Sequence, residues 1–90
     1  MDNEAIDKMQ IKAIQKVLTD WNPLGEYAKR FKDLDNYYAE SIDLLFYIDK
    51  KSSPARINKL MIEIIEEAFN VNVDPKGSME YALKIRQIIK

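Results

Sequence analysis

The chain of 90 residues contains no cysteine and no histidine. Without cysteine it forms no disulfide and offers no thiolate as a nucleophile or metal ligand. Without histidine it lacks the commonest general base and the commonest metal-binding side chain. Neither a Ser-His-Asp nor a Cys-His set can be assembled from these residues. We therefore expect no catalytic residues, no metal ligands and no independent enzymatic activity.

The chain also has few glycines, no long apolar run and no large excess of either charge. The two glycines, Gly25 and Gly77, are too far apart for a phosphate-binding loop, so we expect no cofactor. No apolar run approaches the roughly 18–20 residues of a membrane span, and the acidic N-terminus lacks the layout of a signal peptide. We therefore predict a cytoplasmic protein without a membrane partner. The 14 basic and 15 acidic residues nearly balance, which argues against nucleic acid as a partner.

The composition that remains is that of a globular helical protein. Apolar residues make up 47% of the chain and charged residues 32%, and this length supports one hydrophobic core. Apolar residues recur at spacings of three and four, which indicates amphipathic helices. The sequence predicts an all-α fold, one domain over residues 1–90, with four main helices packed as an irregular orthogonal bundle. The predicted helices span about 4–21, 35–50, 54–69 and 75–89.

The helix starts carry recognisable capping residues. Ser53 followed by Pro54 is a strong start signal, because the hydroxyl caps the helix and proline suits its first position. Asp35 or Asn36 is expected to cap the second helix, and Asp74-Pro75 or Ser78 the last. The second helix is apolar around much of its surface, so we expect it to be central and the most buried. Residues 26–33 fit either a helical turn or a loop.

The stretch Trp21-Asn22-Pro23-Leu24-Gly25 forms the most specific signal in the chain. Proline disfavours a helical Asn22 and favours an extended one, so the first helix should end near Trp21. Residues 22–25 fit a type I turn, and Gly25 permits a positive φ. Trp21 is expected to anchor this corner against the core, the alternative being a recognition residue. This segment is thus a structural corner or an interaction site, made up of Trp21, Asn22, Pro23 and Gly25.

Aromatic and apolar residues beyond the main helical stripes suggest a binding surface. Tyr37 and Tyr38 are expected to pack in the core with their hydroxyls at its rim, or else to belong to an interaction site. Several other apolar residues lie off the stripes, and an exposed patch of such residues marks an interface: Ile11, Leu44, Phe46, Tyr47, Met79 and Leu83. The leading functional prediction is a non-catalytic protein–protein interaction module. Its partner would be an unidentified protein or a second copy of the chain.

The densest basic patch supports an alternative function. Lys29, Arg30 and Lys32 lie within four residues and could attract an anion or an acidic surface. The alternative is therefore an anion- or nucleic-acid-associated accessory protein that uses this patch.

Two segments together carry a family resemblance. At Trp21-Asn22-Pro23-Leu24-Gly25, followed by Asp35-Asn36-Tyr37-Tyr38 opening a helix, the chain resembles the YugE-like family of small proteins from Bacillus-type bacteria. The resemblance covers nearly the whole length. It implies an all-helical cytoplasmic domain and brings no established activity, so no catalytic residue is carried over. A similar Trp-Asp-Pro-Ile-Gly corner occurs in some small bacterial proteins of toxin–immunity loci, which usually have aspartate at the position of Asn22.

Overall fold

The computed structural model describes residues 8–31 and 35–89, and within these ranges it is helical without any strand. The α-helices are α1 (Lys8–Trp21), α2 (Tyr38–Tyr47), α3 (Pro54–Phe69) and α4 (Ser78–Ile88). Two short 3-10 segments, η2 (Gly25–Arg30) and η3 (Asp35–Tyr37), lie between α1 and α2. The predicted all-α fold of four main helices is confirmed.

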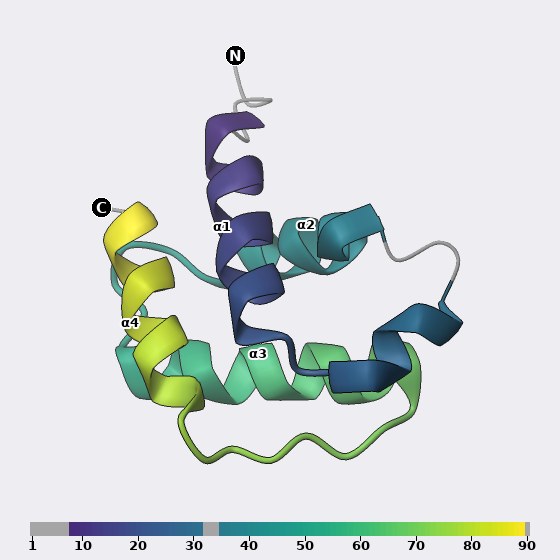
Figure 1. Ribbon diagram of the computed structural model, residues 1–90. Helices are drawn as coiled ribbons and strands as arrows, with labels where there is room; N and C mark the ends of the chain where they lie inside the picture. The colour runs from purple at the N-terminus through teal and green to yellow at the C-terminus, as the bar shows by residue number, and fades with distance from the viewer. Residues whose placement is uncertain (1–7, 32–34, 90) are drawn as a thin grey trace.

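The four α-helices pack around one core. α1 and α3 each contact both α2 and α4, so the contacts form a closed ring. Figure 1 shows α1 and α4 running steeply across α2 and α3, which gives the expected orthogonal arrangement. The centre is filled by side chains with almost no exposed surface, among them Ile14, Leu44, Ile57, Met61 and Ile85.

Two helix boundaries agree with the sequence signals. α3 spans Pro54–Phe69 as predicted, and the Ser53 Oγ accepts a hydrogen bond from the Arg56 N–H at 3.1 Å. This side-chain bond satisfies one of the free N–H groups at the helix start. α1 ends at Trp21 as predicted, whereas the predicted start at residue 4 lies outside the described residues. Of the undecided stretch 26–33, residues up to Arg30 belong to η2.

The predicted start of the last helix at residue 75 is wrong. α4 begins at Ser78, after Gly77 in a left-handed conformation with φ 83°. The Asp74 Oδ1 accepts a hydrogen bond from the Lys76 N–H at 2.9 Å, so Asp74 and Pro75 close a turn and do not open the helix.

The predicted second helix, 35–50, is also wrong at both ends. Asp35, Asn36 and Tyr37 form a left-handed turn with φ values of 46°, 53° and 63°, and α2 spans only Tyr38–Tyr47. From α1, the Gln15 Nε2 donates to the carbonyls of Asp35 at 3.2 Å and Asn36 at 3.4 Å. This contact comes from a residue about twenty positions earlier, so the local sequence does not reveal it.

α2 is not the most buried helix, contrary to the prediction. Its buried residues are Ser41 and Leu44, while α1 buries Ile11, Ile14, Val17 and Leu18. Phe46 is 78% exposed. The face of α2 that meets α1 and α3 is narrower than the apolar part of its surface, so large side chains remain outside.

Candidate functional site: a groove at the α1 corner

The corner begins where α1 ends, at a left-handed Asn22. Its φ is 53°, and its N–H donates to the Leu18 carbonyl at 2.9 Å. This is the helix ending in which a residue just past the helix turns left-handed, a conformation that asparagine tolerates well. The expectation that Pro23 makes Asn22 extended is therefore wrong, because the demands of the helix end outweigh the preference imposed by proline.

The turn predicted over residues 22–25 is confirmed. The Gly25 N–H donates to the Asn22 carbonyl at 3.1 Å, and Leu24 has φ −84° and ψ −16°, as in a type I turn. Gly25 then has φ 56°, so the positive φ that glycine permits is used here. Leu24 is only 3% exposed and fixes the turn to the core.

A second segment, the 70–77 loop between α3 and α4, lies opposite this corner. Its first residue, Asn70, ends α3 in a left-handed conformation, with φ 55°. The Glu66 Oε2 accepts a hydrogen bond from the Val73 N–H at 2.9 Å, and Val73 is buried. Further along, the Ser78 hydroxyl donates to the Pro75 carbonyl at 2.8 Å. These bonds hold the loop in place beside the corner.

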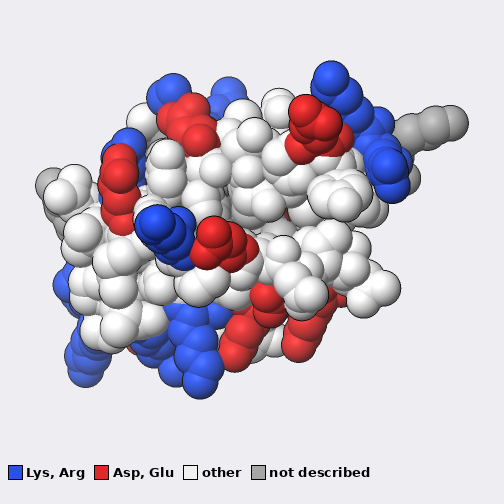
Figure 2. Space-filling model, turned by 60° about the horizontal axis from the view of Figure 1, so that its bottom comes forward, with Lys and Arg blue, Asp and Glu red and all other residues white. Residues whose placement is uncertain are grey.

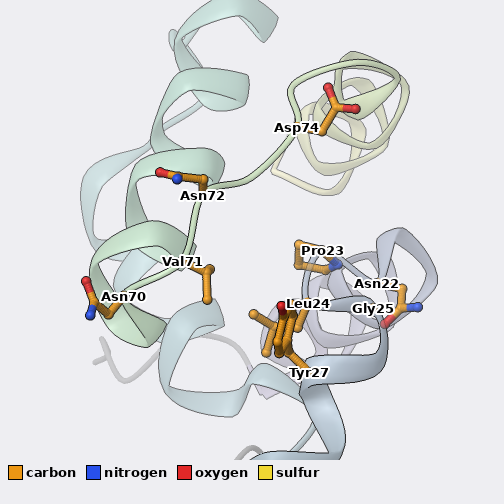
Figure 3. A pocket seen from close by; sticks show the side chains of 9 residues that line it. All are labelled: Asn22, Pro23, Leu24, Gly25, Tyr27, Asn70, Val71, Asn72 and Asp74. Atoms are coloured by element: carbon orange, nitrogen blue, oxygen red, sulfur yellow. The ribbon is translucent and has the colours of Figure 1, made fainter.

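Between the corner and the loop lie two adjoining open hollows, which we call the corner groove. The larger hollow measures about 630 Å³ and the smaller about 390 Å³, and Asn22, Pro23 and Asp74 border both. Both volumes fall in the range of small-ligand sites. In the larger hollow, Figure 3 shows Leu24, Tyr27 and Val71 pointing toward its middle and Asn70 and Asn72 pointing away from it. The smaller hollow adds two aromatic residues, Trp21 and Tyr81.

The position of Trp21 fits both of the alternatives considered from the sequence. It is half-buried and packs against the core cluster, so it anchors the corner. It also lines the smaller hollow and is therefore accessible to a ligand there.

Tyr37 and Tyr38, the other predicted site residues, lie apart from the groove lining and differ from one another. Tyr37 is 2% exposed, with its ring edge-on to Phe69 at 6.2 Å. Its hydroxyl is buried and has no hydrogen-bond partner among the described residues, so the expected position at the rim is wrong. Burial raises the pKa of the Tyr37 hydroxyl, and the nearby Leu24 backbone offsets only part of this. Tyr38 is 45% exposed and so can contact a partner.

The apolar residues expected off the main stripes divide into two groups. Ile11 and Leu44 are buried, whereas Met79 and Leu83 on α4 are 39% and 47% exposed. Phe46 and Tyr47 are 78% and 56% exposed, and their rings meet edge to face at 5.2 Å. These two adjacent residues form what we call the α2 surface: Phe46 and Tyr47.

The basic patch has two members in the described part of the chain, since Lys32 lies outside it. Lys29 and Arg30 are exposed, and the Arg30 guanidinium lies over the Tyr27 ring at 5.1 Å. Figure 2 shows basic and acidic side chains interspersed over the face that it presents. On that face the positive charge does not form one continuous surface.

Among the described residues, no three His, Cys, Asp or Glu side chains are grouped in a way that could hold a metal ion. No helix in the described ranges is long and apolar enough to cross a membrane. Burial raises the pKa of Glu40, with a smaller contribution from Asp43. This carboxyl lies near the core residues Leu18, Leu44 and Met61, away from the corner groove.

Sequence reasoning found the corner but not its partner residues. Tyr27, Tyr81 and the 70–77 loop complete the groove, and no motif links them to the corner. The alternation in Val71-Asn72-Val73 was the nearest signal, but it does not indicate which segment the loop faces.

No protein-family model, curated protein or solved structure matches this chain. The resemblance to the YugE-like family stays a prediction.

Proposed function

We propose that the protein is a non-catalytic module that binds another protein through the α2 surface. The observation that supports this most is the 78% exposure of Phe46 beside the 56% exposure of Tyr47. Large aromatic side chains lose favourable burial when they face water, and they are enriched in protein interfaces. A partner that covers the edge-to-face pair would recover this burial.

The charges around the α2 surface fit a polar rim. Glu40 and Asp43 belong to the same helix, and Lys50 and Lys51 follow it. Interfaces commonly have an apolar centre surrounded by polar groups, and the central aromatic residues contribute most of the binding free energy. Phe46 and Tyr47 therefore make the strongest contacts in this proposal.

A comparison of variants tests the proposal. The wild type and a Phe46→Ser/Tyr47→Ser variant are used as bait in lysate of the native host, with quantitative mass spectrometry of the captured proteins. Leu83→Ser is the matched control, since it truncates an exposed apolar residue on α4. Sedimentation velocity of each protein tests whether the partner is a second copy.

The expected result is one partner, or a dimer, that the α2 variant loses and the control keeps. Each truncated aromatic should weaken binding by at least about fivefold, since hot-spot residues contribute more than about 1 kcal/mol. The proposal is wrong if the wild type is a monomer with no captured partner, or if both variants bind as the wild type does.

The second candidate, an anion- or nucleic-acid-associated accessory protein, rests on the exposed Lys29 and Arg30. Such binding would weaken steeply with salt, because phosphate contacts release counterions. A titration with labelled single- and double-stranded DNA at about 50 and 200 mM NaCl distinguishes the two candidates. Loss of a salt-sensitive complex in a Lys29→Ala/Arg30→Ala variant would favour the second.

A further inference from the structure

We propose that the corner groove is a second binding site, which takes a proline-rich segment of another chain in the polyproline II conformation. The site is separate from the α2 surface, so the proposal does not depend on the proposed function.

The aromatic lining is the first observation. Tyr27 lines the larger hollow, Trp21 and Tyr81 line the smaller one, and Pro23 borders both. Grooves lined by aromatic rings are the usual receptors for polyproline II segments, because proline rings pack against flat aromatic faces. A polyproline II helix has three residues per turn, so prolines three residues apart lie on one side of it and can enter adjoining hollows.

The polar groups of the groove suit such a ligand as well. A polyproline II segment makes no internal hydrogen bonds, so its carbonyls need outside donors. Donors are available from the Trp21 indole N–H, the Tyr27 hydroxyl and the amide of Asn22, which borders both hollows. Among the described residues that line the larger hollow, Asp74 alone is charged. The smaller hollow adds Lys76 and Glu80, one of each sign, so neither hollow has an excess of positive charge for a phosphate. A neutral ligand rich in backbone carbonyls fits the groove better than a phosphate.

The groove is also fixed before any ligand arrives. Backbone bonds from Asn22 to Leu18 and from Gly25 to Asn22 hold the corner, and the Glu66 carboxylate holds the loop at Val73. A fixed groove and an already extended ligand both lower the entropic cost of binding.

Asn70, Asn72 and Asp74 have the alternating spacing of ligands in calcium-binding loops. However, Figure 3 shows these three side chains pointing in different directions, and the Asp74 Oδ1 already accepts a bond from the Lys76 N–H. They do not converge on a common point where a cation would sit.

Two pools of dodecapeptides test the proposal. The first has a fixed Pro-x-x-Pro core with random flanking and x positions that exclude Trp, and the second has glycine in place of both prolines. Binding is followed by the anisotropy of a fluorescein label on the peptides. The emission of Trp21, the single tryptophan, reports whether the bound peptide reaches the smaller hollow.

We expect the proline pool to reach half-maximal binding at a protein concentration at least about tenfold lower than the glycine pool does. This corresponds to a difference of about 1.4 kcal/mol in binding free energy. Trp21 emission should change in parallel, and raising NaCl from about 50 to 200 mM should change binding less than twofold, since no phosphate is contacted. Tyr27→Ser and Tyr81→Ser should each weaken binding at least about fivefold. Tyr38→Ser removes a tyrosine outside the groove and should leave binding unchanged, as should Phe46→Ser/Tyr47→Ser.

The proposal is overturned if neither pool raises the anisotropy, if both pools bind equally, or if Tyr38→Ser weakens binding as much as the groove variants do. Circular dichroism of each variant confirms that it is folded. Because Tyr27 is 55% exposed, its truncation removes little packing, so Tyr27→Ser remains a valid test even if Tyr81→Ser unfolds the chain.

Discussion

The left-handed turn at Asp35–Tyr37 can be tested by comparing the stabilities of glycine and alanine variants at position 36. A left-handed turn favours glycine there, whereas the interior of a helix favours alanine. At Asn36 φ is 53° and ψ is 39°, a conformation that costs a non-glycine residue about 1–2 kcal/mol. Glycine avoids that cost but loses about 0.5–1 kcal/mol more backbone entropy than alanine. Asn36→Gly should therefore be more stable than Asn36→Ala by about 0.5–1 kcal/mol. If residue 36 instead lay inside a right-handed helix, alanine would be the more stable by about 0.8–1 kcal/mol.

The assay is thermal unfolding of both variants, followed by circular dichroism at 222 nm. For a chain of this size about 1 kcal/mol moves the Tm by roughly 4–8 °C, so the glycine variant should melt about 2–8 °C above the alanine variant. The matched control is Asp43, an exposed position inside α2, where alanine should exceed glycine by about 1 kcal/mol. If alanine is also the more stable residue at position 36, the left-handed turn does not exist and the reasoning is refuted.

Three further predictions follow from buried or partly buried groups. Trp21→Ala should lower the free energy of unfolding by less than the value of about 3–5 kcal/mol that is typical of a fully buried ring, because Trp21 is half-buried. A urea midpoint equal to that of the wild type would show that Trp21 does not anchor the corner. Tyr37→Phe should be neutral or stabilising by up to about 1 kcal/mol, because it removes a buried hydroxyl that has no hydrogen-bond partner within geometric limits among the described residues. A loss above about 1 kcal/mol would reveal a hydrogen bond, for example with the nearby Leu24 backbone. Because the pKa of Glu40 is raised in the folded state, its stabilising contribution is complete at low pH and is lost as the pH rises through the folded pKa. Glu40→Gln should therefore be more stable than the wild type at pH 7. The difference between the urea midpoints of the two proteins should narrow as the pH falls below 4.5, the ordinary pKa of a glutamate side chain. A difference that does not change with pH would contradict this.

The contrast between α3 and α2 shows how much of the fold could be predicted from local signals. At α3 the Ser53 cap, Pro54 at the first position and a regular apolar stripe all favour the same helix, and its bounds agree with the structure. At the start of α2, Asp35 and Asn36 fit either a helix cap or a left-handed turn. The contact that accompanies the left-handed turn comes from Gln15, far away in the sequence.

The corner groove shows the same limit at the candidate site. The turn over residues 22–25 depends on its own residues, so it could be predicted from proline and glycine chemistry. The groove needs the 70–77 loop, whose position depends on the bond between Glu66 and Val73 and on the packing of α3 and α4. Sequence spacing alone contains no information about a contact between two loops separated by about two helices.

The left-handed turn also bears on the α2 surface. Apolar residues spaced three and four apart predict an inward stripe through Tyr38, Ile42, Leu45 and Ile48 on the second helix. The structure buries Ile48 as expected, but it also buries Tyr37, Ser41 and Leu44, each one residue before the expected position, while Ile42 and Leu45 are only partly buried. One residue corresponds to a rotation of about 100° about the helix axis.

This rotation runs against simple burial. It places Ser41 in the core, where its hydroxyl has no hydrogen-bond partner among the described residues, and it leaves Phe46 78% exposed. Backbone strain, a buried hydroxyl without a partner and an exposed aromatic ring each lower the stability of the isolated chain. Natural sequences depart from local rules in this way mainly at functional sites, where another requirement offsets the cost. The left-handed turn that the Asn36 variants test directly precedes α2, the helix that leaves Phe46 at the surface. The stability measurement at Asn36 therefore tests the start of the helix that carries the proposed binding surface.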